Sequence, residues 1–506
     1  MHLHQKIRET ASLCYDEFSK SDSSFIPVLL SVPGLKHKSE NSAPPETFEK
    51  RGKPQKDLYF SQNFPGKEYF MKRLIRLVLA STLCFPASAC SKPLLSPDDP
   101  VTLVMWHVYG EQAGSPMDQL IEEFNETEGM EKGIIISTAR LSNAYSIGQE
   151  LSEALSDKPG APDMPDLFTC HINDAKNIGM DNLLDWNDWF SETEQEEFIP
   201  GFLEDGRIGS QLAVLPLSKS THVLMVNGSG FARFQQDTGI SLQSLETWDG
   251  FFEAADAYRQ WSDGTPFCAF DYLLRAIELY AEEQGAENLC SDSEWYDPGN
   301  EILHEAVLRF AKEIARGTIV ISDRYSNTQI MTGEVLCGVG SSATILYYND
   351  TVTYPDGTSE PMDLQVVPFM HAETGKPLMT IAGVGLCARK TTEQKAEAAS
   401  VFAHWLLDPD RNLSFVTSAG YMPVKKSSAE AIQKVQFSDA GYGNLYEALG
   451  QMTQTYQACS EPSFKDYYSK AEQFYNAVRN LQQSVSEETD PDQFAEQVWN
   501  ILITIR

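Results

Sequence analysis

Many side chains in this sequence could do chemistry, but few stand at a spacing that a catalytic reaction needs. The sequence contains no G-x-S-x-G nucleophile turn, no H-E-x-x-H zinc motif and no G-x-x-x-x-G-K-[ST] phosphate loop. Residues 383–388 match the dinucleotide pattern G-x-G-x-x-A, but a tightly packed strand explains them better. The 72 Asp and Glu residues make chance carboxylate pairs unavoidable, so no glycosidase pair can be identified.

Histidines could also bind a metal, but their positions argue against it. They are scattered through the chain after residue 100, at positions 107, 171, 222, 304, 371 and 404. None stands at the short, repeated spacing that metal sites use. The sequence therefore predicts no metal site and no cofactor.

Polar and aromatic residues that follow predicted strands suit the binding of a small molecule. In open α/β sheets, ligands bind at the loops after the carboxyl ends of the strands. Such loops are expected at residues 107–112, 173–174, 218–221, 341–342 and 383–385. The candidate ligand-binding residues are His107, Tyr109, Asn173, Asp174, Ser218, Ser220, Thr221, Phe270, Tyr272, Ser341, Ser342 and Tyr421. Core packing is the alternative for Phe270 and Tyr272, and a helix cap is the alternative for Asn173 and Asp174.

The elements that must position these residues follow the order of a doubly wound α/β sheet. Residues 101–106 form an apolar run of strand length. A helix capped by Ser115 follows, with an apolar stripe from Met117 to Phe124, and residues 134–136 form the next strand. Thr247 is expected to cap another helix. Short apolar strands are predicted at 166–170, 212–216, 223–226, 335–339, 364–367 and 381–388, and helices predominate from about residue 427.

The length and charge of the chain exclude several classes of protein. A chain of 506 residues with 42% apolar residues can build more than one core. A net charge of −33 argues against a nucleic-acid-binding protein, because no basic surface is available to neutralise phosphates. It also argues against electrostatic docking on an anionic membrane.

A secretory signal begins inside the chain, at Met71. Three basic residues between 72 and 76 precede an apolar run at 77–87, which is too short to span a bilayer. The sequence Ala-Ser-Ala-Cys at 87–90 resembles a lipobox, so Cys90 is the expected lipidation site; an ordinary signal peptide is the alternative. Residues 71–90 are thus a predicted lipoprotein signal peptide and 91–100 a tether. Residues 1–70 are a disordered leader or a misassigned gene start.

The cysteines of the remaining chain are widely spaced, at positions 170, 268, 290, 337, 387 and 459. They form no C-x-x-C pair and no dense framework, and several lie in apolar strings. Buried free thiols are the favoured interpretation, with disulfides as the alternative.

The chain resembles the family 1 extracellular solute-binding proteins of ABC importers, which include maltose- and glycerol-phosphate-binding proteins. The resemblance covers nearly all of the chain after residue 90. It rests on the segments 101–109 (VTLVMWHVY), 165–170 (PDLFTC), 215–221 (LPLSKST), 246–249 (ETWD), 333–335 (GEV) and 418–424 (SAGYMPV). The chain departs from the family at Met225–Gly228, where Y-Y-N-[KR] is usual, and at Ala343, where a tryptophan is frequent.

The resemblance implies a two-lobed periplasmic-binding-protein fold of type II, with doubly wound sheets joined by hinge crossings. The first lobe would contain residues 101–217 and 369–408, and the second lobe 218–368 and 409–506. Crossings are expected near Pro216–Ser218, Val367–Phe369 and Leu407–Pro409. The implied protein is a monomer, held at the outer face of the cytoplasmic membrane by its lipid. It would close on a small solute, with a sugar or polyol as the favoured class, and meet ABC permease subunits.

Three functional hypotheses remain open on the sequence. The first is a substrate-binding lipoprotein of an ABC importer, which binds its ligand without turnover. The second is a secreted glycan-active enzyme, which requires a close carboxylate pair. The third is a ligand-sensing module for a membrane receptor, which would lack neighbouring permease genes.

Overall fold

The computed structural model describes residues 93–109, 115–141, 146–156, 158–291, 295–322, 325–462 and 467–505. Residues from Ala89 to the C-terminus belong to one compact unit. The predicted leader, the signal peptide and the lipidation site at Cys90 lie outside the described residues. No helix among the described residues has the length and apolar character that a membrane span requires.

The first lobe is built on a five-stranded sheet with the order β2-β1-β3-β17-β6. The first three strands are parallel, whereas β17 runs antiparallel to β3 and β6. The strands are β1 (Val101–His107), β2 (Ile134–Leu141), β3 (Leu167–Cys170), β17 (Gly385–Ala388) and β6 (Leu215–Pro216). The helices are α3 (Pro116–Glu126), α4 (Glu128–Lys132), α5 (Ile147–Leu155), α6 (Ile172–Ile178), α7 (Glu192–Gln195), α13 (Glu393–Leu406) and α14 (Pro409–Ala419).

Helix α3 confirms the predicted apolar stripe but not its predicted cap. Met117, Ile121 and Phe124 are buried, as the 3.6-residue period requires. Ser115 adopts a left-handed backbone with φ 33° and makes no side-chain cap to the helix. Its hydroxyl instead donates to the carboxylate of Asp118 in the first turn. Thr247, in contrast, caps α9 as predicted, accepting a hydrogen bond from the Gly250 amide at 3.3 Å.

The second lobe is built on another five-stranded sheet, with the order β11-β8-β12-β7-β15. Here β11, β8 and β12 are parallel, and β7 is antiparallel to β12 and β15. The strands are β7 (His222–Asn227), β8 (Cys268–Phe270), β11 (Ile319–Ile321), β12 (Cys337–Ser341) and β15 (Leu364–Val367). The helices are α8 (Gly228–Thr238), α9 (Trp248–Trp261), α10 (Leu273–Glu283), α11 (Glu301–Arg316), α12 (Ser326–Met331), α16 (Ala440–Thr455), α17 (Tyr467–Gln482) and α18 (Pro491–Thr504). The short helix α15 (Lys426–Ile432) packs instead on α14 of the first lobe, where the Ser428 hydroxyl donates to the Pro409 carbonyl at 3.2 Å.

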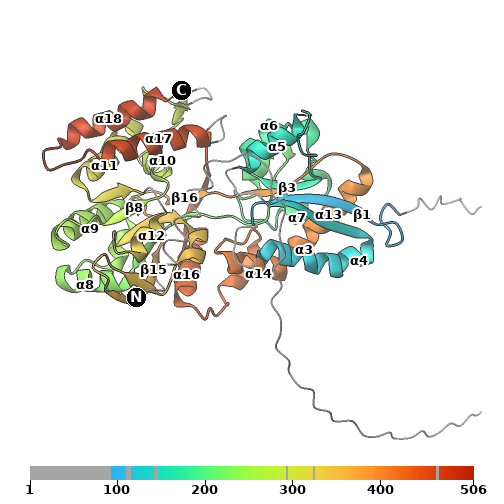
Figure 1. The fold of residues 1–506 in the computed structure, drawn as a ribbon, viewed down its shortest axis with the longest axis horizontal. Helices are drawn as coiled ribbons and strands as arrows, with labels where there is room; N and C mark the ends of the chain where they lie inside the picture. The colour runs from blue at the N-terminus through green and yellow to red at the C-terminus, as the bar shows by residue number, and fades with distance from the viewer. Residues whose placement is uncertain are drawn as a thin grey trace, which may run out of the picture. The chain divides into compact units, whose positions relative to one another are not determined.

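The two sheets and their helices separate clearly within the compact unit (Figure 1). Smaller strand pairs are β4 (Arg207–Ile208) with β5 (Gln211–Leu212), β9 (Cys290–Ser291) with β10 (Trp295–Tyr296), β13 (Thr351–Thr353) with β14 (Ser359–Pro361), and β16 (Leu378–Ile381) with β18 (Gln457–Ser460). The 3-10 helices are η2 (Met180–Asn182), η3 (Trp186–Asp188), η4 (Glu204–Gly206), η5 (Leu242–Glu246) and η6 (Ser342–Tyr347). This arrangement confirms the predicted α/β class.

Three segments link the lobes, and they are hydrogen-bonded to one another. Ser220 and Ala382 exchange both of their backbone hydrogen bonds at 3.0 Å. Lys219 and Met422 likewise exchange both of their backbone hydrogen bonds, at 3.2 and 2.6 Å, so Met422 lies on the opposite side of this segment from Ala382. The segment 218–221 is therefore the central link, with a neighbour on each side.

Two of the links lie further along the chain than the sequence predicts. The Tyr456 hydroxyl donates to the Phe369 carbonyl at 2.8 Å, and His371 pairs with Thr247, so the chain remains on the second lobe there. The chain crosses from the second lobe to the first at Ala382 rather than near Val367–Phe369, because β16 first pairs with β18 in the second lobe. The third crossing also lies later than predicted. The Val424 carbonyl accepts from the Ile199 amide of the first lobe at 2.9 Å, so the chain returns to the second lobe after Val424 rather than near Leu407–Pro409.

The six cysteines of the described residues are free. Cys170 and Cys387 lie in neighbouring strands with their sulfurs 3.6 Å apart. Cys170, Cys268, Cys337 and Cys387 are buried, whereas Cys290 and Cys459 are half-buried. Burial raises the pKa of Cys290 to about 12 and that of Cys459 to about 11, so few thiolates are present near neutral pH.

This burial predicts an ordered reaction with a thiol reagent. In a chain that starts at Ser91, we expect Cys290 and Cys459 to react slowly in the native state and the four buried thiols to react only in denaturant. Counting labelled thiols by mass spectrometry, with and without urea, checks this. The matched control, Cys290→Ser, should lower the native count by one, and fewer than six labels in urea would contradict the free-thiol assignment.

Candidate functional site

The central link, Ser218–Thr221, joins the two lobes and carries several of the predicted residues. The Tyr109 hydroxyl lies 3.3 Å from the Ser218 hydroxyl, which ties the end of β1 to this link. The Tyr109 ring also packs edge-on against Phe415 and Tyr421. Burial raises the pKa of Tyr109 to about 12, so its hydroxyl stays protonated. Tyr109 therefore supports the link from within the core.

His107 lies directly behind Tyr109 and is fully buried. Its Nδ1 accepts the Tyr109 amide at 3.2 Å, which leaves Nε2 to donate to the Asp118 carboxylate at 3.1 Å. Burial lowers the pKa of His107, and the hydrogen bond with Asp118 opposes this shift. The imidazole thereby connects the end of β1 to the first turn of α3.

Thr221, His222 and Ser342 form a compact polar group at the second-lobe end of the central link; we call it the link triad. The Ser342 amide donates to the Thr221 carbonyl at 2.8 Å, and His222 opposes Ser341 in the β7–β12 ladder. Each triad side chain is buried, yet Thr221 Oγ1, His222 Nδ1 and Ser342 Oγ have no hydrogen-bond partner among the residues that the structure describes. A buried polar atom without a partner is costly, so these atoms are suited to receive a ligand.

The other predicted residues of the second lobe divide into two groups. Tyr272 stacks on His222 with ring centroids 5.1 Å apart and ring planes at 8°, and it is half-buried. Phe270 is fully buried among aromatic rings of the core, including Phe251 and Phe310. Ser341 caps η6, since its hydroxyl accepts the Ala343 amide at 3.3 Å. The structure thus brings Tyr272 to the triad and leaves Phe270 behind the sheet.

The burial of His222 keeps its ring neutral. Desolvation lowers its pKa to about 3, and the nearby positive charge of Arg275 lowers it further. The neutral ring stacked on Tyr272 presents an apolar face beside two hydroxyls. Ser220 lies on the central link itself, and Tyr421 directly precedes Met422 of an outer link. The Tyr421 carbonyl accepts from the Tyr446 hydroxyl at 3.1 Å.

The end of β3 presents the first-lobe part of the site. The Asp174 carboxylate accepts the His171 amide at 3.2 Å, which closes the first turn of α6. Burial raises the pKa of Asp174, and this hydrogen bond opposes the shift. Asn173 Oδ1 is a buried atom that has no hydrogen-bond partner within the described part of the chain. Asp174 therefore takes the cap role, while Asn173 keeps an acceptor available.

Sequence reasoning missed four polar residues near this edge. The Lys219 ammonium pairs with the Asp205 carboxylate, both largely buried. His171 contacts Tyr468 of α17, with ring centroids 5.1 Å apart. Lys219 lay within a predicted loop, but Asp205 and Tyr468 come from distant segments, and no local pattern marks them.

Asp271 is a further site residue that the sequence analysis missed. It directly follows β8, and its carboxylate accepts the Ser326 amide at 2.7 Å and the Ser326 hydroxyl at 3.1 Å. A Cβ on Gly340 would lie only 2.5 Å from the Asp271 carboxylate, so any larger residue there would displace this carboxylate from Ser326. Burial raises the pKa of Asp271 to about 7, although the bonds from Ser326 oppose the shift.

Asp271 predicts a pH-dependent stability. The folded-state pKa lies above the unfolded one, so the folded protein holds the proton more tightly and loses stability as the pH rises from about 4 to 7. In Asp271→Asn this loss is absent, so the variant should gain roughly 4 kcal/mol relative to the parent between pH 4 and pH 8. Urea unfolding across this range measures it. The exposed Asp263→Asn is the matched control, and a pH-independent difference for Asp271→Asn would contradict the prediction.

The part of the chain that the structure describes holds no group of three or more His, Cys, Asp or Glu side chains placed to bind a metal. The side chains gathered at the site are hydroxyls, an amide oxygen, neutral imidazoles and aromatic faces, with the Asp174 and Asp271 carboxyls at the two sheet edges. Such groups can hold and orient an uncharged polar molecule.

Residues 119–441, more than half of the chain, match the family model described as bacterial extracellular solute-binding protein. The comparison with curated proteins found no match. Among solved structures, the chain is similar to a cyclic α-maltosyl-1,6-maltose binding protein from Arthrobacter globiformis, with 17% identity, a TM-score of 0.61, and coverage of 80% of this chain and 99% of that one.

Two further structures have a similar fold. The sugar-binding protein MalE from Xanthomonas citri is 14% identical, with a TM-score of 0.61 and coverage of 80% of this chain and 97% of the other. UgpB from Mycobacterium tuberculosis, in complex with glycerophosphocholine, is 14% identical, with a TM-score of 0.58 and coverage of 80% and 98%. These likenesses confirm the predicted two-lobed periplasmic-binding-protein fold of type II.

Proposed function

The chain belongs to the family of bacterial extracellular solute-binding proteins, and we propose that it captures a small, neutral carbohydrate for an ABC importer. Its task is binding without turnover. An open form takes up the ligand between the lobes, and the closed form presents both lobes to the permease. The ligand can shift this equilibrium only by the difference between its affinities for the two forms.

The observation that carries this proposal is the set of unsatisfied groups in the link triad. Thr221 Oγ1 and Ser342 Oγ are fully buried and unpartnered where the lobes join. A sugar hydroxyl both donates and accepts, so it can satisfy either group. The Tyr272 ring beside the triad can pack against the apolar face of a sugar ring.

The charges at the link favour a neutral ligand. Lys219, the charged residue of the segment 218–221, is already paired with Asp205. A phosphate or carboxylate would gain little from it and would face the Asp174 and Asp271 carboxyls at the two sheet edges. Two of the similar structures are described as sugar-binding, which agrees with this choice, while the third was solved with glycerophosphocholine.

The same proposal covers the location and partners of the protein. Cleavage before Cys90 and lipidation of that residue would hold a monomer at the outer face of the cytoplasmic membrane. The family is extracellular, and the signal-like segment 71–90 supports the anchor. Mass spectrometry of the native N-terminus would test it, because an unmodified or absent Cys90 would exclude the lipid.

Replacing Thr221 with valine tests the ligand assignment. We expect Thr221→Val to weaken the binding of the cognate sugar by about 1–3 kcal/mol, because a sugar hydroxyl is left without its partner. The empty protein should become slightly more stable, since an unpartnered buried hydroxyl is removed. Calorimetry against oligosaccharides measures the affinity, and thermal unfolding measures the stability.

The exposed Thr351→Val on β13 is the matched control and should change neither quantity. Ser342→Ala should repeat the pattern of Thr221→Val. If the protein binds no saccharide and a phosphodiester instead raises its melting temperature, the carbohydrate assignment is wrong. Recovery of a cleaved sugar would replace the binding function with an enzymatic one.

A further inference from the structure

Tyr468 connects the second lobe to the first at the edge where β3 ends. It lies in the first turn of α17, and 37% of its side chain is exposed. Its hydroxyl donates to Glu461 at 2.7 Å and lies 3.4 Å from His171 Nδ1. The Tyr468 and His171 rings meet at 47°, with their centroids 5.1 Å apart. An exposed aromatic ring is thus held against a residue of the other lobe.

The helix that carries Tyr468 is anchored to the second lobe along its length. Near its end, Gln482 Oε1 accepts the Ile321 amide at 2.9 Å, and Arg479 Nε donates to the Ser322 carbonyl at 2.9 Å. At its start, the Tyr467 hydroxyl donates to Glu278 at 3.0 Å. The position of the neighbouring Tyr468 is therefore fixed by contacts on α10 and beside β11.

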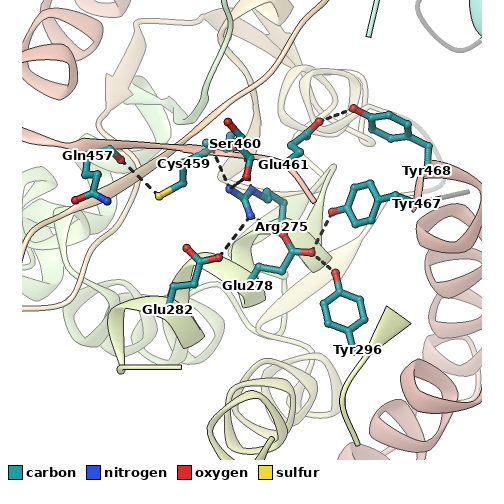
Figure 2. A network of polar contacts seen from close by, with 11 residues as sticks. Arg275, Glu278, Glu282, Tyr296, Gln457, Cys459, Ser460, Glu461, Tyr467 and Tyr468 are labelled. Atoms are coloured by element: carbon teal, nitrogen blue, oxygen red, sulfur yellow. Dashed lines mark hydrogen bonds and ion pairs between the residues drawn. The ribbon is translucent and has the colours of Figure 1, made fainter. Parts of the chain in front are cut away.

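A buried ion pair completes this anchor, as Figure 2 shows. Arg275 donates to Glu278 at 2.7 Å and to the carbonyls of Cys459 and Ser460 at 3.1 Å each. These carbonyls belong to β18, and Glu461 follows directly. The same arginine thus positions both the helix that bears Tyr468 and the strand that leads to its hydrogen-bond partner.

The facing side of the first lobe has the composition of a sugar subsite. Desolvation, aided by Lys219, lowers the pKa of His171 to about 4, so its ring is neutral near pH 7. Asn173, two residues later, has the unpartnered amide oxygen described above. A neutral aromatic wall beside a free acceptor suits a sugar ring and its hydroxyls.

We propose that Tyr468 and His171 form one wall of the ligand site, against which a sugar ring packs, and that Glu461 orients Tyr468. This inference rests on the proposed carbohydrate function and adds a contact from the C-terminal helix α17. Tyr468 and His171 are the contacting residues, whereas Glu461 is a positioning residue.

Calorimetry with maltotriose and cycloalternan as probes, and glycerophosphocholine as the non-saccharide comparison, tests the wall. We expect Tyr468→Ala to weaken saccharide binding about 10- to 30-fold, because a buried aromatic contact is lost. Tyr468→Phe keeps the ring and should stay within about threefold of the parent. Trp261→Ala, which removes an equally exposed ring from α9, should leave affinity unchanged.

The role of Glu461 is tested by a double-mutant cycle. Glu461→Ala should weaken binding in the parent but add nothing in the Tyr468→Phe background, where no hydroxyl remains to be held. A merely structural role would give the same loss in both backgrounds. Thermal unfolding of each variant shows that it is folded, and Tyr468→Leu provides a bulky replacement if the alanine variant is not.

The outcomes separate this inference from the proposed function. If the parent binds a saccharide and Tyr468→Ala binds it equally well, the wall is wrong and the carbohydrate function stands. If the unmutated protein binds no saccharide, the proposed carbohydrate function is wrong, and the proposed Tyr468–His171 wall is rejected with it. If both hold, the parent binds a saccharide, and the affinity falls when the Tyr468 ring is removed or when Glu461 no longer orients it.

Discussion

Arg275→Met is expected to lower the free energy of unfolding by about 3–5 kcal/mol. Arg275 and Glu278 are almost completely buried, with their charged groups 2.7 Å apart. Without the guanidinium, the Glu278 carboxylate would be a buried charge that accepts hydrogen bonds from the hydroxyls of Tyr296 and Tyr467 but has lost its ion-pair partner. The carbonyls of Cys459 and Ser460 would also lose their donor. Urea unfolding followed by circular dichroism measures the change.

A second substitution separates the loss of charge balance from the loss of packing. Arg275→Met with Glu278→Gln removes both charges and leaves an acceptor for the tyrosine hydroxyls, so much of the stability should return. Arg233→Met is the control for an exposed arginine, because its pair with Glu360 is half solvated and should contribute about 1 kcal/mol or less. Equal destabilisation by the single and double variants would contradict the assignment of the loss to an uncompensated buried charge.

The Arg275 network shows which property of a charged pair a sequence can predict and which it cannot. Residues 275 and 278 are one helical turn apart, so their pairing is local and could have been read from the sequence. Their burial could not be, because it depends on β18 and α17, nearly 200 residues later. A charged pair on a helix is usually solvated, and only tertiary packing reveals that this one is not.

Periodic elements were predictable because their signal is contained within one segment. The buried stripes of α3 and α9 follow from residue spacing alone, and so do the apolar strands β1 and β15. The links between the lobes were less predictable. Their positions depend on which strands pair across the chain, and the β16–β18 pair moves the second link to Ala382.

The same distinction applies to the candidate site. Strand-end logic predicts Thr221, Tyr272 and Ser342 as ligand-binding residues, and the structure brings these three residues together. It could not separate Tyr272 from Phe270, two positions earlier, because strand β8 ends between them and the alternation no longer applies. The unpartnered state of the triad atoms depends on the full set of neighbours, which no sequence pattern contains.

Lys219→Met is expected to have the second large effect, with a loss of about 3–5 kcal/mol in the free energy of unfolding. The ammonium group is largely buried on the central link and pairs with Asp205, whose carboxylate is also shielded from solvent. Removing the lysine leaves this carboxylate without its ion-pair partner, and the Lys176 charge, which also interacts with Asp205, remains. Because the central link joins the two lobes, we expect the loss of stability to appear in the global urea unfolding of the protein.

The histidine at the end of β3 provides an independent readout of the same change. Burial and the Lys219 charge lower the pKa of His171, while Asp205 raises it. Lys219→Met should therefore raise the pKa of His171 as well as destabilise the protein, whereas Lys219→Met with Asp205→Asn should recover stability and lower this pKa again. NMR titration of His171 follows the charge, and Lys312→Met, which breaks an exposed pair with Asp492, is the control for both measurements. An unchanged His171 pKa in Lys219→Met would show that the ammonium does not act on this edge of the site, and the loss of stability would then have to come from packing alone.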